Sequence, residues 1–328
     1  MPARSLVLMF SGQGSQYYQM GRAFFDGNAK FRSELLRLDA VATRLVGRSM
    51  VDILYHDNRK KDEPFEAIQL TSAAIFMIEY ALVRTLLDDG FKPNYLLAAS
   101  LGVYAAAAAA DVLDPADALE CITRASTVYE TRCPKGAMIA ILGRPALHRE
   151  LRALQDYSDV AAVNFDGHFV VSTLEKHVDQ ITSELDRNGV AFQKIPVSYP
   201  FHSRWMDGCA DAAQAIFATL TYREPRIPII CCSQTTVVGP ISSATIWNAV
   251  RKPIEFQQSI AKLEMHGPCS YVDVGPAGTL ATFLKYALPS TSASKAHPIL
   301  SPFGVELKNY ERLTSQRELF EHQPVNAG

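Results

Sequence analysis

The sequence predicts an α/β protein in two parts, a large subdomain built on a parallel sheet and a small subdomain inserted into it. In the first and last thirds of the chain, apolar strand-like runs alternate with helix-like runs, which is typical of a parallel sheet covered by helices. Between them the order changes to strand, helix, strand, strand, helix, strand, the split βαβ plan of ferredoxin-like domains. A chain of 328 residues, 48% of them hydrophobic, can bury cores of this size.

The large subdomain is expected at residues 1–127 and 200–288. It begins with a short apolar run and then the polar, glycine-rich turn Ser11-Gly12-Gln13-Gly14-Ser15-Gln16. Its long helix, expected over 71–87, begins with a Thr/Ser cap and ends near Gly90. Its expected strands are 6–10, 95–98, 227–232 and 270–274, and its clearest helices are 71–87 and 279–286.

The small subdomain is expected at residues 128–199. Its expected strands are 137–142, 160–164, 169–172 and 191–197, with helices over 146–156 and 174–188. Residues 289–328 are rich in Ser, Thr, Pro and charge, so we expect a C-terminal surface extension.

Composition excludes several classes of protein. A net charge of -2 and 20% charged residues argue against disorder and against a general nucleic-acid-binding surface. The 6 cysteines form no Cys-x-x-Cys pair, so we expect reduced thiols and no metal site. The uncharged stretch 95–110 is shorter than the roughly 20 apolar residues that cross a bilayer. With no signal-like N-terminus, the expectation is a cytoplasmic protein without membrane contact.

The most informative segment is Leu97-Ala-Ala-Ser-Leu-Gly-Val-Tyr-Ala-Ala106, in which Ser100 stands between a strand-like and a helix-like run. This pattern is typical of a nucleophile elbow, where a sharp strand-to-helix turn exposes the serine oxygen. The strict pattern has glycine where this chain has Ala98, although alanine is also small. The elbow makes the large subdomain α/β-hydrolase-like; the simpler alternative is a serine in ordinary helix packing.

Three segments read together are more specific than any one of them: Gly12-Gln13-Gly14-Ser15-Gln16, the Ser100 segment, and Tyr199-Pro200-Phe201-His202-Ser203. Their order resembles the malonyl-CoA:acyl-carrier-protein transacylase family over about nine-tenths of the chain. Alone, His202 is as well explained by packing or capping, and the Gln13 turn by a simple loop.

The resemblance implies a catalytic set of Ser100, His202, Gln13 and Leu101. Ser100 would be the nucleophile and His202 its general base, giving an acyl-serine intermediate. The Leu101 backbone N–H and a group from the Gln13 turn would form an oxyanion hole. In the family a backbone carbonyl orients the histidine, and Asn248 is the candidate here. No bound cofactor is implied; phosphopantetheine enters only as the arm of the substrate.

Malonyl-handling relatives carry an arginine about two dozen residues after the serine, and an ungapped alignment places Ala125 there. Arg124 is adjacent, but one helical step turns a side chain by about 100°. A pocket without this arginine should prefer uncharged acyl groups, because an unpaired buried carboxylate is costly. The full set of expected substrate-binding residues is Gln69, Ala125, Arg124, Asn164, Phe201 and Asn248.

Beside the nucleophile, Ala98, Ala99 and Val103 replace the glycine, histidine and glutamate usual in the family. The chain thereby resembles the trans-acting acyl hydrolases found beside polyketide synthases that lack built-in acyltransferases. The leading hypothesis is hydrolysis of acyl groups from acyl-carrier protein, with water accepting the acyl group. Carrier proteins are acidic, so we expect a basic docking surface. Its candidate residues are Arg204, Arg251 and Lys252.

Two alternatives stay open. The chain could be a transacylase that moves an acyl unit to carrier protein, because Phe201 before His202 resembles the malonyl-selective pattern and Arg124 lies close to the expected position. It could also be a carrier-protein-binding scaffold without turnover, against which the joint presence of Gln13, Ser100 and His202 argues.

Overall fold

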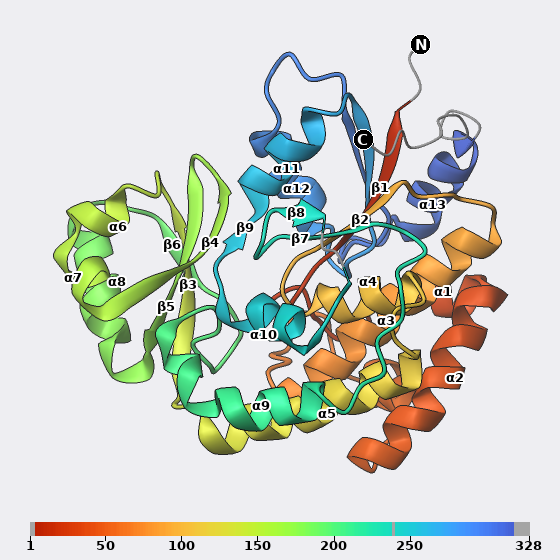
Figure 1. The fold of residues 1–328 in the computed structure, drawn as a ribbon, viewed down its shortest axis with the longest axis horizontal. Coiled ribbons are helices and arrows are strands. Elements are labelled where there is room, and N and C mark those ends of the chain that lie inside the picture. Colours follow the sequence, from red (N-terminus) through yellow and green to blue (C-terminus); the bar gives the residue numbers. More distant parts are fainter. Residues whose placement is uncertain (1–3, 238–239, 318–328) are drawn as a thin grey trace.

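A computed structural model describes residues 4–237 and 240–317, which form two sheets with their helices (Figure 1). The large sheet has six strands in the order β11-β10-β1-β2-β7-β8, all parallel except β8. Its strands are β1 (Ser5–Phe10), β2 (Tyr95–Ala98), β7 (Ile229–Cys231), β8 (Thr236–Val237), β10 (Cys269–Asp273) and β11 (Lys295–Pro298). The predicted α/β class with a parallel sheet is confirmed.

The apolar run of β1 is continuous because both faces of the large sheet are covered. Leu6, Leu8 and Phe10 face one core, whereas Val7 and Met9 face the other. The larger core lies against α1 (Arg22–Gly27), α2 (Ala29–Val46), α3 (Ile68–Asp88), α4 (Gly102–Ala109), α5 (Pro115–Arg132), α9 (Ala210–Phe217) and α10 (Ser243–Arg251). The smaller core lies against α11 (Phe256–Glu264) and α12 (Thr279–Ala287).

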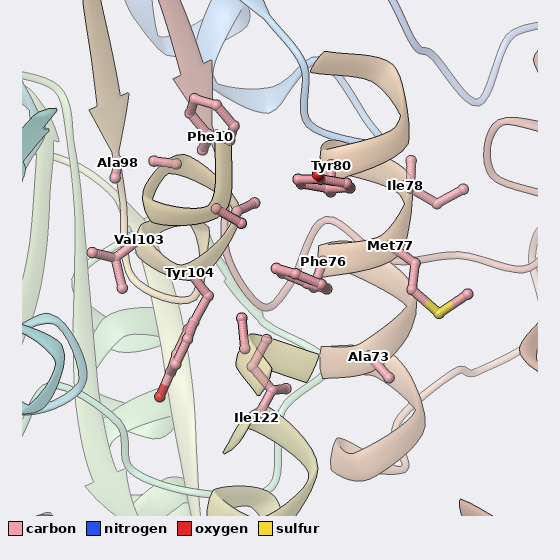
Figure 2. Close-up of a cluster of buried hydrophobic side chains, with 14 of the residues drawn as sticks. Phe10, Ala73, Phe76, Met77, Ile78, Tyr80, Ala98, Val103, Tyr104 and Ile122 are labelled. Atoms are coloured by element: carbon pink, nitrogen blue, oxygen red, sulfur yellow. The ribbon is translucent and has the colours of Figure 1, made fainter. Parts of the chain in front are cut away.

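The helix α3 runs through the larger core. Figure 2 shows Phe76 and Tyr80 of this helix pointing toward the alanine-rich α4, which follows β2. Within the described residues, α3 is long and apolar enough to span a membrane, but 83% of its most apolar window is buried inside the protein. It is therefore a core helix.

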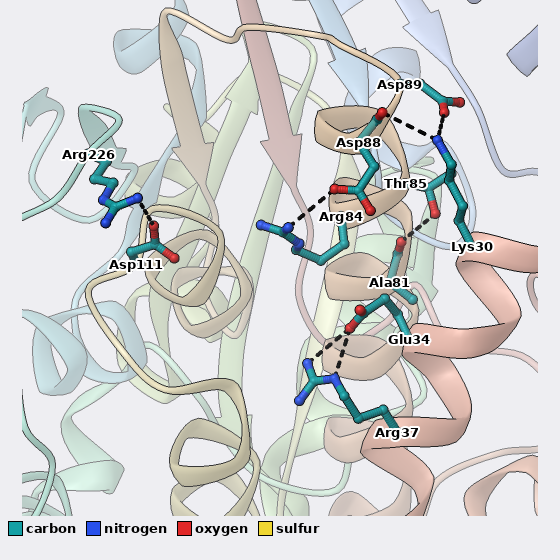
Figure 3. A network of polar contacts seen from close by, with 10 residues as sticks. All are labelled: Lys30, Glu34, Arg37, Ala81, Arg84, Thr85, Asp88, Asp89, Asp111 and Arg226. Atoms are coloured by element: carbon teal, nitrogen blue, oxygen red, sulfur yellow. Dashed lines mark hydrogen bonds and ion pairs between the residues drawn. The ribbon is translucent and has the colours of Figure 1, made fainter.

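Polar contacts lie around the exposed side of α3 (Figure 3). Lys30 of α2 pairs with Asp89, and Arg84 pairs with Asp88. On the buried side of the helix, the Thr85 hydroxyl donates to the Ala81 carbonyl. Exposed ion pairs of this kind contribute little to the free energy of unfolding. The apolar face of α3 is what holds the helix in place.

The small sheet has the strand order β6-β3-β5-β4-β9. Its strands are β3 (Gly136–Leu142), β4 (Ser158–Phe165), β5 (His168–Leu174), β6 (Phe192–Lys194) and β9 (Ile254–Glu255). The helices α6 (Leu147–Glu150), α7 (Arg152–Tyr157) and α8 (Val178–Arg187) complete the predicted ferredoxin-like unit. Ile139, Ile141 and Phe169 pack under α7 and α8, leaving the opposite face of the sheet toward the large subdomain.

The two subdomains are more closely connected than the predicted boundaries imply. The boundary at residue 127 falls inside α5, and the small sheet begins only at Gly136. The strand β9, which belongs in sequence to the large subdomain, pairs in parallel with β4. The predicted helix over 146–156 is broken at Leu151, whose extended backbone separates α6 from α7.

The expectation of a C-terminal surface extension is wrong for residues 295–314. The strand β11 pairs with β10 and forms the edge of the large sheet. Behind it Ile299 and Leu300 are fully buried, and α13 (Glu306–Thr314) buries Tyr310 and Leu313 in the larger core. The composition is polar because an edge strand and an amphipathic helix each bury only one face. Residues 318–328 of the expected extension lie outside the described residues.

Candidate active site

Ser100 occupies the turn between β2 and α4. Its φ of 54° lies in the left-handed region, which a non-glycine residue adopts only where the surroundings enforce it. Gly102 explains how the turn can be so tight. A Cβ atom there would lie 2.6 Å from the carbonyl oxygens of Phe10 and Ser11, so only glycine lets α4 start against the end of β1. Ala98, the departure from the strict elbow, is simply buried at the end of β2.

The glycine-rich turn after β1 touches the elbow directly. A Cβ atom at Gly12 would lie 2.8 Å from the Cβ atom of Ser100, so a larger residue would displace the serine. The Gln13 side chain is tied to α3, since its Nε2 donates to Ser72 Oγ at 2.6 Å and its Oε1 accepts from Thr71 Oγ1 at 3.1 Å. The turn is thus held over the serine by the sheet on one side and by α3 on the other.

His202 faces Ser100 from the segment that follows the small sheet. Its Nε2 lies 2.9 Å from Ser100 Oγ, and its Nδ1 lies 2.8 Å from the carbonyl oxygen of Lys252. A carbonyl only accepts, so Nδ1 carries the hydrogen and Nε2 presents its lone pair to the serine hydroxyl. The His202 backbone N–H donates to the Val250 carbonyl at 2.9 Å, which fixes the backbone from which the imidazole ring projects.

The carbonyl that orients His202 belongs to Lys252, so the expectation for Asn248 is wrong. The Asn248 carbonyl lies in the last turn of α10 and accepts the backbone N–H of Lys252 at 2.9 Å. Lys252 is the C-cap with an extended backbone, and its carbonyl points away from the helix ladder. Helix ends leave such carbonyls without intrahelical partners. The side chain of Asn248 does not line the cavities around Ser100.

Burial sets the protonation state of this histidine. His202 is only 3% exposed, and desolvation lowers its pKa to about 4, while the hydrogen bond to the Lys252 carbonyl opposes the shift. The imidazole is therefore neutral at pH 7, the state in which Nε2 can accept a proton.

Gln13 and Leu101, which line the inner pocket together with Ser100, each present a backbone N–H group. In the described part of the chain, neither the Gln13 nor the Leu101 backbone N–H donates to another protein group. Leu101 also precedes the first turn of α4, where the helix dipole is positive. Both are therefore free to bind an oxygen atom of a ligand.

Cavities open on both sides of Ser100, and Gln13 and Phe201 line both of them. The inner pocket, of about 40 Å³, lies between α3, α4 and α5. The outer cavity, of about 310 Å³, lies between the two subdomains and reaches His202, Asn164 and Phe283. The inner pocket is lined by Gln13, Ile68, Ser72, Ser100, Leu101, Tyr104, Ile122, Ala125, Ser126, Tyr129, Phe201 and Val250.

The expected substrate-binding residues divide into two groups. Ala125 lines the inner pocket, Asn164 the outer cavity and Phe201 both. Arg124 lies outside, with a 48% exposed side chain and Glu120 at 3.5 Å. The expectation that Gln69 binds substrate is wrong. Its Nε2 donates to Thr127 Oγ1 and Glu130 Oε2 on the surface of α5. Its neighbours on α3, Ile68 and Ser72, line the pocket instead because Gln69 lies on a different side of the helix.

The expected basic docking residues are largely neutralised. Arg204 pairs with Asp159 at 3.3 Å and stacks over the Trp205 ring, while Arg251 forms a two-pronged contact with Asp207. Of the three, Lys252 has an exposed side chain with no ion pair among the described residues. Their expected role in docking therefore loses much of its electrostatic basis.

Several residues around Ser100 carry no signal in the sequence. The Lys252 carbonyl is a backbone group, and Ser72, Ser126 and Tyr129 lie in long helices without any motif. Only the helical spacing of Ala125 and Tyr129, one turn apart on α5, could have suggested that they share a face. Across the described residues, no three His, Cys, Asp or Glu side chains gather as a metal site would need.

A serine and a neutral histidine at the carboxyl end of a parallel sheet, facing an inserted ferredoxin-like unit, define the two-subdomain acyltransferase class of α/β proteins. Comparison of the sequence with known families agrees. The chain belongs to the acyl transferase domain family, which matches residues 7–318. The resemblance noted from the three sequence motifs is thus confirmed.

Similar proteins include two bacterial relatives of about the same length. The polyketide biosynthesis acyltransferase homolog PksD of Bacillus subtilis (strain 168) is 41% identical, covering 93% of this chain and 94% of the relative. The polyketide biosynthesis acyltransferase homolog BaeD of Bacillus velezensis is 39% identical, covering 94% and 95%. The acyltransferase domain from the second module of the salinomycin polyketide synthase superimposes with a TM-score of 0.84 at 27% identity, covering 96% of this chain and 73% of that one.

Proposed function

We propose that this protein cleaves acyl thioesters of acyl-carrier protein in polyketide biosynthesis, through an acyl-serine on Ser100, and that water is the final acceptor. The polyketide setting rests on the relatives named above. The observation that carries the substrate preference is the neutral inner pocket. Among its described lining residues there is no arginine or lysine. The ungapped alignment from Ser100 places Ala125, one of these residues, where malonyl-handling relatives have their arginine.

The arrangement supports the chemistry in two steps. His202 Nε2 takes the proton of Ser100 Oγ as the oxygen attacks the thioester carbonyl, and the Gln13 and Leu101 N–H groups receive the developing oxyanion. The proton then passes to the leaving thiolate, and the thiol of the phosphopantetheine arm departs. In the second step His202 activates water, which attacks the acyl ester and releases the free acid and Ser100.

The two cavities would hold different parts of the substrate, the acyl group in one and the pantetheine arm in the other. The inner pocket of about 40 Å³ has room for the few heavy atoms of a short acyl group, since one water needs at least 10–15 Å³ on this measure. The outer cavity of about 310 Å³ is large enough for the pantetheine arm and extends between the subdomains. Short uncharged acyl groups cannot supply the decarboxylation that drives chain extension, so their removal by water would clear blocked carrier proteins.

Transfer to a second thiol is the alternative, favoured by the acyltransferase family and the names of its relatives. Intact-protein mass spectrometry separates the two. The protein is incubated with acetyl- or butyryl-carrier protein, and separately with malonyl-CoA plus unloaded carrier protein. Free acid from the uncharged acyl groups, with little malonyl adduct, supports hydrolysis. A lasting malonyl adduct that moves to carrier protein would establish transfer, and unchanged acyl-carrier protein would favour the scaffold.

The pH dependence of acylation should follow His202. The base works only when neutral, so the rate should fall on acidification through the pKa of about 4 and stay level from pH 5.5 to 7.5. The measurement is kcat/KM for a small acetyl thioester between pH 3.5 and 8. Circular dichroism at each pH and recovery of activity after return to pH 7 separate titration from unfolding. A midpoint near 6.5 would contradict a buried, desolvated base.

Changing Ala125 to arginine should shift selectivity toward malonyl thioesters. A guanidinium in the inner pocket would pair with the malonyl carboxylate in two-pronged fashion, and we expect the malonyl-to-acetyl ratio of kcat/KM to rise at least tenfold. Ala125→Met controls for size and should slow both substrates without favouring malonyl. Arg124→Ala should leave the ratio unchanged, because Arg124 lies outside with Glu120. An unaltered ratio in Ala125→Arg would show that the acyl group binds elsewhere.

A further inference from the structure

Glu79 is a buried carboxyl group that the chemistry above leaves unused. It lies on α3 with no exposed surface. Its Oε1 accepts the backbone N–H of Ser11 at 2.7 Å and lies 2.9 Å from the Ser11 hydroxyl, which donates to it. Among the described residues its Oε2 has no hydrogen-bond partner. Burial raises the pKa of Glu79 well above its usual range.

A second buried acid, Asp273, acts electrostatically on Glu79. Asp273, at the end of β10, accepts backbone N–H groups from Gly275 at 2.9 Å and Ala281 at 2.8 Å, and these donors stabilise its charged form. Burial still raises the pKa of Asp273, to about 6. Its negative charge raises the pKa of Glu79 further. The donors to Asp273 and the burial of Glu79 therefore both favour the charge on Asp273 and the proton on Glu79.

The contact with Ser11 places Glu79 one residue from the turn that touches the nucleophile. Ser11 directly follows β1, and Gly12, beside Ser100, comes next. The Ser11 hydroxyl also lies 3.1 Å from Ser15 Oγ, which donates to the Gly12 carbonyl at 2.8 Å. Contacts within the turn therefore stabilise it, and its first residue, Ser11, is hydrogen-bonded to Glu79.

The helix α3 holds this turn at two points along one face. Ser72 binds the Gln13 side chain, and Glu79 binds Ser11. The two helix residues are seven positions apart, which is about two turns and returns nearly to the same side of the helix. Holding both Ser11 and Gln13 determines where the backbone N–H of Gln13 sits relative to Ser100.

We propose that Glu79 is a positioning residue for the oxyanion site, acting through Ser11 to hold the Gln13 backbone N–H over Ser100. This rests on the proposed function in that Gln13 is taken as an oxyanion donor. The role needs an acceptor at Oε1, and glutamine supplies one with the same shape. Methionine has a similar volume and offers no comparable acceptor. Glu79→Gln should therefore preserve the effect that Glu79→Met removes.

The test measures the labelling rate of Ser100 by a methyl fluorophosphonate, whose phosphoryl oxygen must enter the oxyanion site whatever the natural substrate is. We expect Glu79→Gln within threefold of the wild type and Glu79→Met slower by about 100-fold, as for loss of one oxyanion donor. With acetyl thioester, kcat should fall by a similar factor and KM change less than threefold. Thr85→Val is the matched control, a buried α3 residue whose hydroxyl bonds only the Ala81 carbonyl (Figure 3).

Thermal unfolding accompanies every variant. Labelling of Glu79→Met within threefold of the wild type overturns the proposal, and so does Glu79→Gln as slow as Glu79→Met. Should Glu79→Met fail to fold, Ser11→Ala replaces it. This variant loses the hydroxyl contact with Oε1, and an unchanged labelling rate would again overturn the proposal. Rapid labelling of wild-type Ser100 without thioester turnover would instead contradict the proposed function. The labelling rates of the Glu79 variants would still test the role of Glu79.

Discussion

Replacing Ser100 by alanine is expected to abolish the acyl-enzyme and all thioester cleavage above the uncatalysed rate. The serine oxygen is the atom to which the acyl group would bond, and it lies 2.9 Å from the Nε2 atom of His202. Alanine keeps the Cβ atom, so the contact with Gly12 and the elbow itself should survive. The readout is the acetyl adduct after mixing with acetyl-carrier protein, measured by intact-protein mass spectrometry.

A matched control for this variant is Ser259→Ala. Ser259 of α11 is fully buried, but its hydroxyl donates to the Glu255 carbonyl at 2.8 Å and does not line the cavities at Ser100. Its adduct should form as in the wild type. An adduct of undiminished size in Ser100→Ala, mapped to another residue, would refute the assignment of the nucleophile.

Replacing His202 by alanine should slow acylation by several orders of magnitude, on the order of 10⁴-fold, while Ser100 remains in place. Without Nε2, the Ser100 hydroxyl keeps no side-chain hydrogen-bond partner among the described residues that could take its proton. The measurement is single-turnover formation of the acyl-serine from a small acetyl thioester, which removes any effect of carrier-protein docking.

The control for the histidine is His148→Ala. His148 lies on α6, where its Nε2 contacts the Ser158 carbonyl at 3.3 Å, and it lines neither of the described cavities at Ser100. This variant should acylate at the wild-type rate. Equal rates for His202→Ala and the wild type would mean that a different group activates the serine, and the pH profile would then need a new explanation.

Much of the fold follows from local patterns. The alternation of apolar strand-like and helical runs predicted the parallel sheet, and the changed order over 137–197 predicted the ferredoxin-like unit, because side-chain periodicity reports which face of each element is buried. The same reasoning failed for residues 295–314, where β11 and α13 bury only one face each. The polar composition of that segment conceals this half-burial.

At the site, the sequence by itself determined the elbow and the motif set. The small residues around Ser100 and the glycine at 102 dictate a sharp turn, since local sterics decide whether a chain can pass that close to a neighbouring strand. His202 was recognised from its motif. Its distance from Ser100, however, depends on how the small subdomain returns to the large one.

The tertiary structure alone decided which groups meet over long separations in the chain. It selected the Lys252 carbonyl instead of Asn248, turned the Gln69 side chain of α3 toward the surface of α5, and brought Glu79 to Ser11. The physical reason is that helix capping, helix rotation and buried polar contacts depend on packing between elements. Neighbouring residues determine local shape, whereas the partners of a buried hydrogen bond are decided only when the elements are assembled.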